Sequence, residues 1–356
     1  MWKPEWPRHL LKVLGLALLS SVAGSDCGSS IPHPPRMPSA TLSRASLITE
    51  IAFGSCYVPQ FERSEIWHAI ASSNPDVFLF LGDNVYQSEE KGEPELLELR
   101  EAYALLARDE PFAALRSRIP VLTTWDDHDY GLDNAGAEFA AKYQSEALFE
   151  EVWAIPASDP RKSRDGIYHR RIVGPMGRRV QMILLDTRFF RTSPESENSD
   201  ALEPTMLGVE QWRWLETNFD EPAEIRILVS SIPLLSQNDQ GESWNGWPRE
   251  RERLFAMLDR TSGTIVLLSG DSHFGSFYRR TDTGDQPLWE LTSSSLNLPL
   301  PEANQYVDSD PARVGPAHFE ENFCFLSIDW TAKVISLELR NAAGETIAAQ
   351  RIPVSR

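Results

Sequence analysis

The fold of this chain is decided by the stretch Val77-Phe78-Leu79-Phe80-Leu81-Gly82-Asp83-Asn84. Five consecutive apolar residues are typical of a strand that is buried on both faces, as in parallel or mixed sheets. The strand ends at a glycine, and Asp83 follows at the carboxyl edge of the sheet. Because α/β sheets bind their ligands outside that edge, the stretch predicts an α/β fold with a site at one end of its strands.

Four further apolar runs end in side chains that bind metals or transfer protons. They are 51–53 before Gly54-Ser55-Cys56, 121–124 before Trp125-Asp126-Asp127-His128-Asp129, 182–185 before Asp186-Thr187-Arg188, and 265–268 before Ser269-Gly270-Asp271-Ser272-His273. Strands that run in parallel end at the same edge of a sheet, so we expect the five clusters to converge on one metal site.

Helical patterns alternate with these strands in the first three quarters of the chain. We expect helices over residues 64–72, 93–107, 138–152, 208–218 and 249–258. After residue 294 the pattern becomes that of strands, and residues 323–330 and 334–340 predict an antiparallel hairpin. The combination favours an α/β sandwich of two mixed sheets over a single doubly wound sheet.

Composition indicates a folded protein that does not bind nucleic acids. The 356 residues are 41% hydrophobic and 24% charged, and the formal net charge is −18. Such a surface repels nucleic-acid phosphates, so we expect no nucleic-acid partner. A small phosphate ligand would need a local positive centre, which bound metal ions supply.

The first 23 residues have the three parts of a secretory signal peptide. These parts are the basic residues Lys3, Arg8 and Lys12, the apolar run 13–22, and the small residues Ser21 and Ala23. The apolar run is short for a bilayer span, so we expect a secreted or periplasmic protein with no stable membrane anchor after cleavage. An uncleaved anchor is the alternative. Residues 24–46 predict a Ser/Pro-rich tether, and 47–356 the folded domain.

The three cysteines have different surroundings in the sequence. An odd number in an exported chain leaves at least one thiol unpaired. Cys27 and Cys324 could pair, although Cys324 lies in an apolar run and is more typical of a small buried hydrophobic residue. Cys56 instead ends a strand beside the other polar clusters. As a thiolate it would favour a softer or more highly charged ion than Ca²⁺.

The carboxylates around His128 indicate a cation, because like charges this close raise one another's pKa unless a cation lies between them. Asn134 follows and offers a neutral oxygen. Acidic residues fall at EF-hand offsets, but Leu132 stands where that loop needs glycine, which excludes an EF-hand and leaves calcium open. Asp271 and His273 share one face of an extended segment and suit a transition metal.

Several residues have a second interpretation that the sequence leaves open. Asp83 could be a turn or helix-capping residue, and Arg188 could pair with a neighbouring acid instead of holding a phosphate. Packing is favoured over a role in the site for Tyr57, Trp244 and Trp247. Structural roles are expected for His68 and His169, whereas His318 could reach the site.

The five strand-end motifs, in order, resemble the PhoD-like alkaline phosphatases, a branch of the calcineurin-like metallophosphoesterases. The stretches 243–254 and Glu290-Leu291-Thr292-Ser293-Ser294-Ser295 also resemble this family. The resemblance implies a four-layer α/β/β/α sandwich that hydrolyses phosphate esters with a metal-activated hydroxide. It also implies iron and calcium as cofactors.

The resemblance and the residue patterns together assign two sets of site residues. The expected metal ligands are Cys56, Asp83, Asp127, Asn134, Asp271 and His273, and the expected catalytic residues are His128 and Arg188. The expected substrate is a small phosphate ester. The alternative is an exported calcium-dependent binding module with the same fold and no catalysis.

Overall fold

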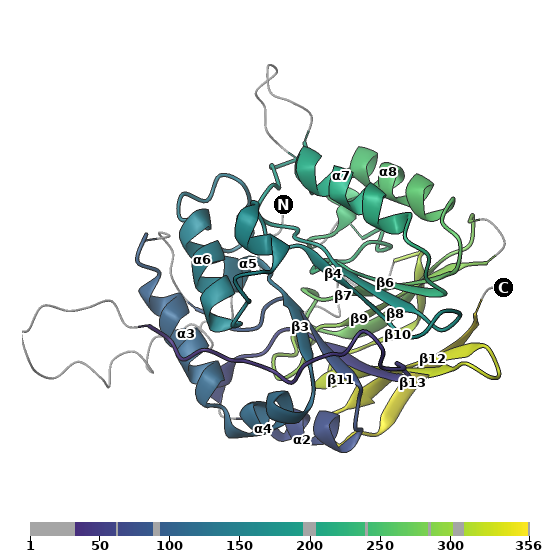
Figure 1. Ribbon diagram of the computed structural model, residues 1–356, viewed down its shortest axis with the longest axis horizontal. Helices are drawn as coiled ribbons and strands as arrows, with labels where there is room; N and C mark the ends of the chain where they lie inside the picture. Colours follow the sequence, from purple (N-terminus) through teal and green to yellow (C-terminus); the bar gives the residue numbers. More distant parts are fainter. Residues whose placement is uncertain are drawn as a thin grey trace, which may run out of the picture.

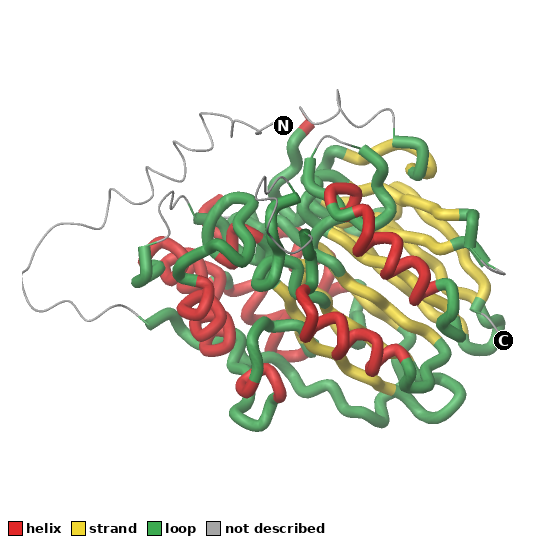
Figure 2. The backbone as a smooth tube through the Cα atoms, turned by 90° about the horizontal axis from the view of Figure 1, so that it is seen from above, coloured by secondary structure: helices red, strands yellow, loops and turns green. Residues whose placement is uncertain are grey.

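Two mixed β-sheets pack face to face, and helices cover the outer face of each (Figure 1). This computed structural model describes residues 33–61, 63–87, 93–194, 204–238, 241–283, 286–301 and 310–354. The expected four-layer α/β/β/α sandwich is confirmed. Figure 2, seen from above, shows helices lying over the strands.

The first sheet contains the strands that precede three of the polar clusters. Across the sheet the order is β13 (Thr346–Pro353), β12 (Val334–Asn341), β11 (Asn322–Asp329), β1 (Glu50–Gly54), β2 (Val77–Leu81) and β3 (Val121–Thr124). Strands β1, β2 and β3 are parallel, so their carboxyl ends lie at one edge. The predicted hairpin is present, since β11 and β12 pair antiparallel.

The second sheet contains the strands of the other two clusters. Its order is β10 (Arg313–His318), β8 (Gly275–Arg280), β9 (Leu288–Ser293), β7 (Thr264–Ser269), β6 (Ile225–Val229), β5 (Val180–Leu184) and β4 (His169–Val173). Strands β5, β6, β7 and β9 are parallel. The five runs therefore belong to two sheets.

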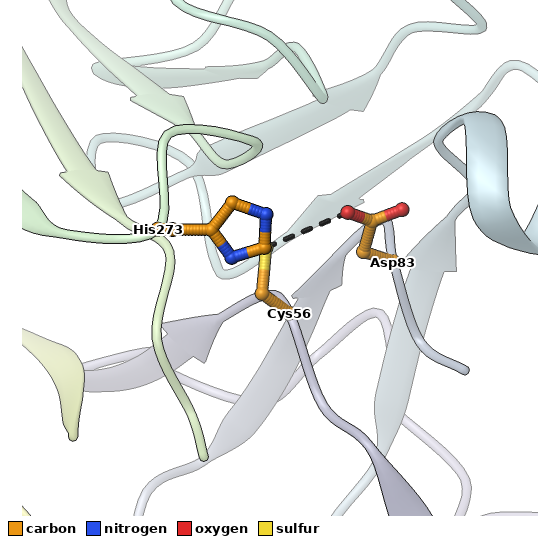
Figure 3. A group of neighbouring side chains, drawn as sticks. All are labelled: Cys56, Asp83 and His273. Carbon is orange, nitrogen blue, oxygen red and sulfur yellow. Dashed lines mark hydrogen bonds between the residues drawn. The ribbon is translucent and has the colours of Figure 1, made fainter. Parts of the chain in front are cut away.

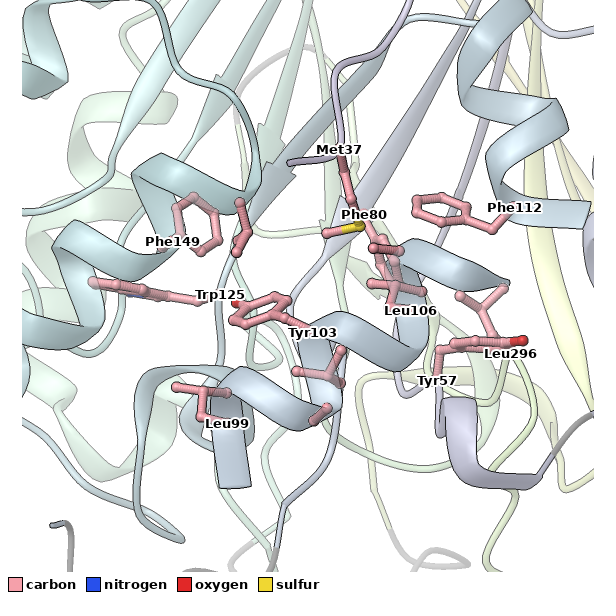
Figure 4. Packing of buried hydrophobic residues seen from close by; sticks show 14 of the residues in the cluster. Met37, Tyr57, Phe80, Leu99, Tyr103, Leu106, Phe112, Trp125, Phe149 and Leu296 are labelled. Carbon is pink, nitrogen blue, oxygen red and sulfur yellow. The ribbon is translucent and has the colours of Figure 1, made fainter. Parts of the chain in front are cut away.

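Strand β2 shows why its sequence is continuously apolar. Val77, Leu79 and Leu81 point into the core between the two sheets. Phe78 and Phe80 point the other way, into the core beneath the helices, where Phe80 is shown in Figure 4. Both faces of the strand are removed from water, which fixes its register and the position of Asp83 at its end.

The helices agree with the sequence pattern, with two omissions. They are α2 (Glu65–Ser72), α3 (Leu97–Arg108), α4 (Glu110–Arg118), α5 (Asp127–Tyr130), α6 (Lys142–Val152), α7 (Gly208–Phe219) and α8 (Pro248–Leu258), with 3-10 turns at Pro59–Phe61, Pro160–Ser163 and Trp244–Gly246. The short helix α5 was not predicted, and neither was helix α4. Its Pro111 lies in the first turn, where proline is tolerated, and Asp109 caps it by accepting the N–H of Phe112.

Residues 33–46 lack regular structure, but they lie against the body of the protein. Met37 is buried in the core under the helices, and its N–H donates to the carbonyl of Val152 at 2.6 Å. Farther along, the Arg44 carbonyl accepts the N–H of Gly174. The predicted signal peptide and the first part of the predicted tether lie outside the described residues. Among the described helices, none is both long and apolar enough to cross a bilayer.

Candidate metal centre

The polar clusters meet at one end of the sandwich, where the carboxyl ends of parallel strands from both sheets lie close together. Cys56 and Asp83 follow β1 and β2 of the first sheet, whereas Asp271 and His273 follow β7 of the second. Their ligand atoms fall into overlapping groups within 4.8 Å of one another. The structure thus brings together side chains that lie as far apart in sequence as Cys56 and His273.

The first group joins Cys56, Asp83 and His273, and we call it the sulfur group (Figure 3). The Cys56 Sγ lies 3.5 Å from Asp83 Oδ2 and donates to it in the protonated form. The hydroxyl of Tyr86 donates to the same carboxylate oxygen at 2.6 Å. Tyr86 was not predicted to be in the site. Its position three residues after Asp83 was the available signal.

The second group joins Asp83, Asp126, Asp127 and Asp271, and we call it the carboxylate group. Asp83 belongs to both groups, as a ligand that bridges two cations must. Asp126 Oδ2 is buried and has no hydrogen-bond partner in the described part of the chain. An orphaned carboxylate oxygen among three other carboxylates fits a bound cation, since burying it unpaired is costly.

The protonation of these carboxylates follows from their surroundings. Burial, followed by the neighbouring carboxylates, raises the pKa of Asp83 and of Asp271. Burial also raises the pKa of Asp126, although Arg188 opposes it. Burial acts in the same direction on Asp127, but Arg188, His128 and the Asn134 N–H together hold the pKa of Asp127 below its ordinary value. Because these carboxylates repel one another, they cannot all be ionised unless a cation lies between them.

A third group of possible ligand atoms comes from Asp127, His128 and Asp133. It is the most exposed of the three groups, because Asp133 is exposed. Asn134 contacts it through its backbone N–H, which donates to Asp127 Oδ2 at 2.7 Å. The side-chain amide of Asn134 is exposed and donates to Asp133 at 3.0 Å. Asp133 was not predicted to be a ligand, and the only signal for it was its EF-hand offset.

The imidazole of His273 has the hydrogen bonding and the protonation state that are typical of a metal-binding histidine. Its Nδ1 lies 3.0 Å from the carbonyl of Leu298, which can only accept, so Nδ1 carries the proton and Nε2 the lone pair. Burial lowers the pKa of His273 to about 4, which keeps the ring neutral near pH 7. The Cys56 thiol differs, because burial and the Asp83 carboxylate raise its pKa. A strongly attracting cation is therefore needed to displace its proton.

The backbone is strained at most of the expected ligands. Cys56, Asp83, Asn134, Asp271 and His273 have φ values of 59°, 49°, 57°, 65° and 58°. This left-handed region is unfavourable for residues other than glycine and is concentrated at functional sites. Other non-glycine residues with positive φ lie elsewhere in the fold, but Cys56, Asp83, Asp271 and His273 also have ligand atoms that converge. This coincidence supports a site over an ordinary turn at Asp83.

Arg188 is fully buried against acidic residues. Its guanidinium contacts Asp126 and lies 2.6 Å from Glu242, whereas Asp127 is 3.9 Å away. Asp186 accepts only its backbone N–H. The sequence left open whether Arg188 pairs with a nearby acid or holds a phosphate, and in the structure it pairs with acids. Glu242, which also pairs with Arg191 at 2.6 Å, was not found from the sequence because it lies in a loop without a motif.

His128 lies at the edge of the centre. Its N–H donates to Asp127 Oδ1 at 2.9 Å, and its ring packs over Tyr86 with the centroids 4.4 Å apart. The side chain is 8% exposed, so it borders both the carboxylates and the solvent. That position suits a group that exchanges a proton with a bound ligand.

The residues for which packing was favoured do pack. The Tyr57 hydroxyl donates to Asp109 and contacts Ser64, and its ring packs on Trp67. Trp244 and Trp247 belong to the core beside α8.

The remaining candidates have ordinary surroundings. His68 is exposed on α2, and His169 is buried beside Arg161. His318 ends β10 opposite Gly275. Cys324 is buried on β11, as expected of a small hydrophobic residue.

Comparisons with known proteins agree with this architecture. Residues 51–328 match the sequence model of the PhoD-like phosphatases. Alkaline phosphatase D of Bacillus subtilis (strain 168) is 24% identical over 271 residues, which are 62% of this chain and 45% of that protein. A solved structure of PhoD superposes with a TM-score of 0.67 at 19% identity, covering 89% of this chain and 69% of the other.

The chain spans less than half the length of its Bacillus relative. The family match nevertheless includes all five strand-end clusters, strand β9 with the serines that follow it, and nearly all of β11. The solved structure shares the fold of the two sheets. The chain therefore belongs to the PhoD-like phosphatase family.

Proposed function

We propose that this protein is a metal-dependent hydrolase of phosphate esters. The observation that carries the proposal is Asp83, which is shared by a sulfur-containing group and a group of carboxylates at a strained strand end. Two cations joined by one carboxylate form the arrangement that clamps a phosphate ester and activates a water. The family match and the absence of a serine-nucleophile motif in the sequence support the same chemistry.

The two groups suit cations of different kinds. Cys56 and His273 supply sulfur and nitrogen, which favour a transition metal, and we assign iron to the sulfur group by resemblance. Asp127 and Asp271 supply only oxygen and suit calcium. Asp83 would contact both cations, and Asn134 would complete the calcium ligands from the exposed side. The orphaned oxygen of Asp126 marks the carboxylate group as needing a cation.

Once bound, the cations would lower the pKa of a water and draw negative charge from the phosphate oxygens. His128 borders the carboxylates and the solvent, so its imidazole would donate a proton or hydrogen bond to the leaving oxygen. Arg188 is held by Asp126 and Glu242, so its charge would act on the ester from a fixed position. We propose small phosphate esters as substrates and an exported location, as the sequence predicts.

Hydrolysis of a chromogenic phosphomonoester and a chromogenic phosphodiester, together with elemental analysis, tests the proposal. We expect iron and calcium in the purified protein. A mild calcium chelator should abolish hydrolysis reversibly at alkaline pH, with iron retained and activity restored by added calcium. Full activity in excess chelator would contradict the calcium assignment. A folded protein that binds calcium and hydrolyses neither ester would be the binding module instead.

A further inference from the structure

Ser294 links the two sheets at the sulfur group. It directly follows β9 in the Thr292-Ser293-Ser294-Ser295 stretch and is fully buried. Its Oγ lies 3.1 Å from Cys56 Sγ and accepts the backbone N–H of His273 at 2.7 Å. A single hydroxyl therefore contacts two expected ligands, one from each sheet.

Hydrogen-bond capacity determines the direction of these contacts. A serine hydroxyl has one proton to donate and two lone pairs to accept with. The His273 N–H can only donate, so it occupies a lone pair of Ser294 Oγ. The hydroxyl proton is then available for Cys56. A cysteine that ligates a metal is a thiolate and can only accept, so in the loaded protein Ser294 donates to the sulfur.

The other nearby serines are not equivalent. Ser55 Oγ lies farther from the Cys56 sulfur, at 3.6 Å, and its proton is already donated to the Ser293 carbonyl at 2.9 Å. Ser295 is as buried as Ser294, but its Oγ has no hydrogen-bond partner among the described residues. Ser294 is thus the serine that is placed to donate to the thiolate, and Ser295 is its matched control.

We propose that Ser294 is a positioning residue of the metal centre, which donates a hydrogen bond to the Cys56 thiolate and holds the left-handed backbone of His273. The inference rests on the proposed function, because it requires Cys56 to be a ligand. A hydrogen bond to an ionised sulfur is charge-assisted and stabilises the anion. Partners of this kind orient metal ligands, and their loss typically weakens metal binding by about 10–100-fold.

Cobalt binding tests the role without relying on enzymatic activity. The metal-depleted full chain is titrated with Co²⁺ against a competing chelator, and the near-ultraviolet thiolate-to-cobalt absorption band is recorded. Ser294→Ala should weaken Co²⁺ binding by about 10–100-fold. It should also move the band to lower energy, because the sulfur loses the hydrogen bond that stabilises its electrons. Ser295→Ala should change neither quantity.

Each outcome separates the inference from the proposed function. A wild-type band that is unchanged in Ser294→Ala, with unchanged affinity, overturns the role of Ser294 and leaves Cys56 a ligand. A wild-type protein with no thiolate band overturns the ligand assignment and the inference with it. If Ser294→Ala does not fold, Ser294→Thr decides, since it keeps the hydroxyl. Wild-type affinity in that variant supports the role, and a loss as large as that of Cys56→Ser overturns it.

Discussion

The sulfur group and the carboxylate group share Asp83 but offer different kinds of ligand atoms. In the sulfur group, Cys56 and His273 are soft or intermediate ligands, and the imidazole is held neutral by burial. In the carboxylate group every ligand atom is oxygen, and the buried guanidinium of Arg188 offsets part of the negative charge. Under the proposed function, the sulfur group would hold its cation tightly and the carboxylate group would hold its cation exchangeably.

Asp83 connects the groups, so its substitution should have the largest effect. Asp83→Asn should lose both cations and reduce hydrolysis by at least about 10³-fold, since it removes a ligand common to two electrostatic stabilisers. The metal-free variant should unfold at a temperature no lower than the metal-free wild type, because a buried carboxylate is replaced by a neutral amide. Elemental analysis, ester hydrolysis and thermal unfolding measure these effects.

Asp76 provides a control for the Asp83 experiment. It is also an acid at a strand end, but it lies at the opposite edge and accepts the N–H groups of Thr49 and Glu50. Asp76→Asn should keep both metals and the activity. Calcium retained in Asp83→Asn at the wild-type ratio would show that Asp83 does not bridge the groups.

Cys56→Ser should separate the two groups. The hydroxyl is a poor ligand for a soft cation, so iron should be lost while the carboxylate group still binds calcium. We expect most activity to disappear and the fold to persist, as judged by circular dichroism and by calcium content. Cys324→Ser is the matched control, because that thiol is equally buried but belongs to none of the candidate metal-binding groups in the described part of the chain. Iron at wild-type stoichiometry in Cys56→Ser would exclude the thiolate as a ligand.

His128→Ala should affect rate rather than metal content. Removal of an acid–base group costs about 10²–10⁴-fold in rate. Both cations should remain at wild-type amounts in elemental analysis. Because His128 also lies within reach of Asp127 and Asp133, loss of a cation from the variant would identify it as a ligand and not as a proton donor.

The two groups should respond differently to pH. Burial raises the pKa of Asp126 and Asp271, so protons compete with calcium and its affinity should fall by about tenfold per pH unit for each proton displaced. The pKa of His273 is lowered to about 4, below that of the unfolded chain. The folding stability that His273 contributes is therefore complete above about pH 6.5 and is lost as the pH falls toward 4.

Calcium and iron titrations at several pH values measure this difference. We expect calcium to dissociate on acidification before iron does, and activity to be greatest at neutral to alkaline pH. A clear activity optimum near pH 5 would contradict the assignment of both cations.

Asn134→Ala should have the smallest effect. Its side chain is exposed and donates to Asp133, and its link to Asp127 runs through the backbone N–H, which alanine retains. We expect calcium affinity to fall by about tenfold, as for the weaker ligands and supporting partners of metal sites. An unchanged calcium affinity in isothermal titration would remove Asn134 from the ligand set.

The sequence by itself determined the parts that depend on local patterns. The run over Val77–Leu81 predicted a strand with its correct bounds, because burial on both faces leaves no polar position in it. The same reasoning identified the ends of the other strands and therefore Cys56, Asp127 and His273 as neighbours. Helix α4 was missed because Pro111 follows α3 so closely that the local pattern does not separate a break from a new first turn.

Only the tertiary structure decided which side chains become partners. Arg188 pairs with Asp126 and Glu242, residues 62 and 54 positions away, and no local pattern distinguishes them from Asp186 nearby. The contact between Cys56 and Ser294 spans 238 positions and joins two sheets. The sequence pattern of a strand predicts which residues lie at its end. Which strand ends lie close together depends on how one sheet packs on the other, and that packing is a property of the whole core.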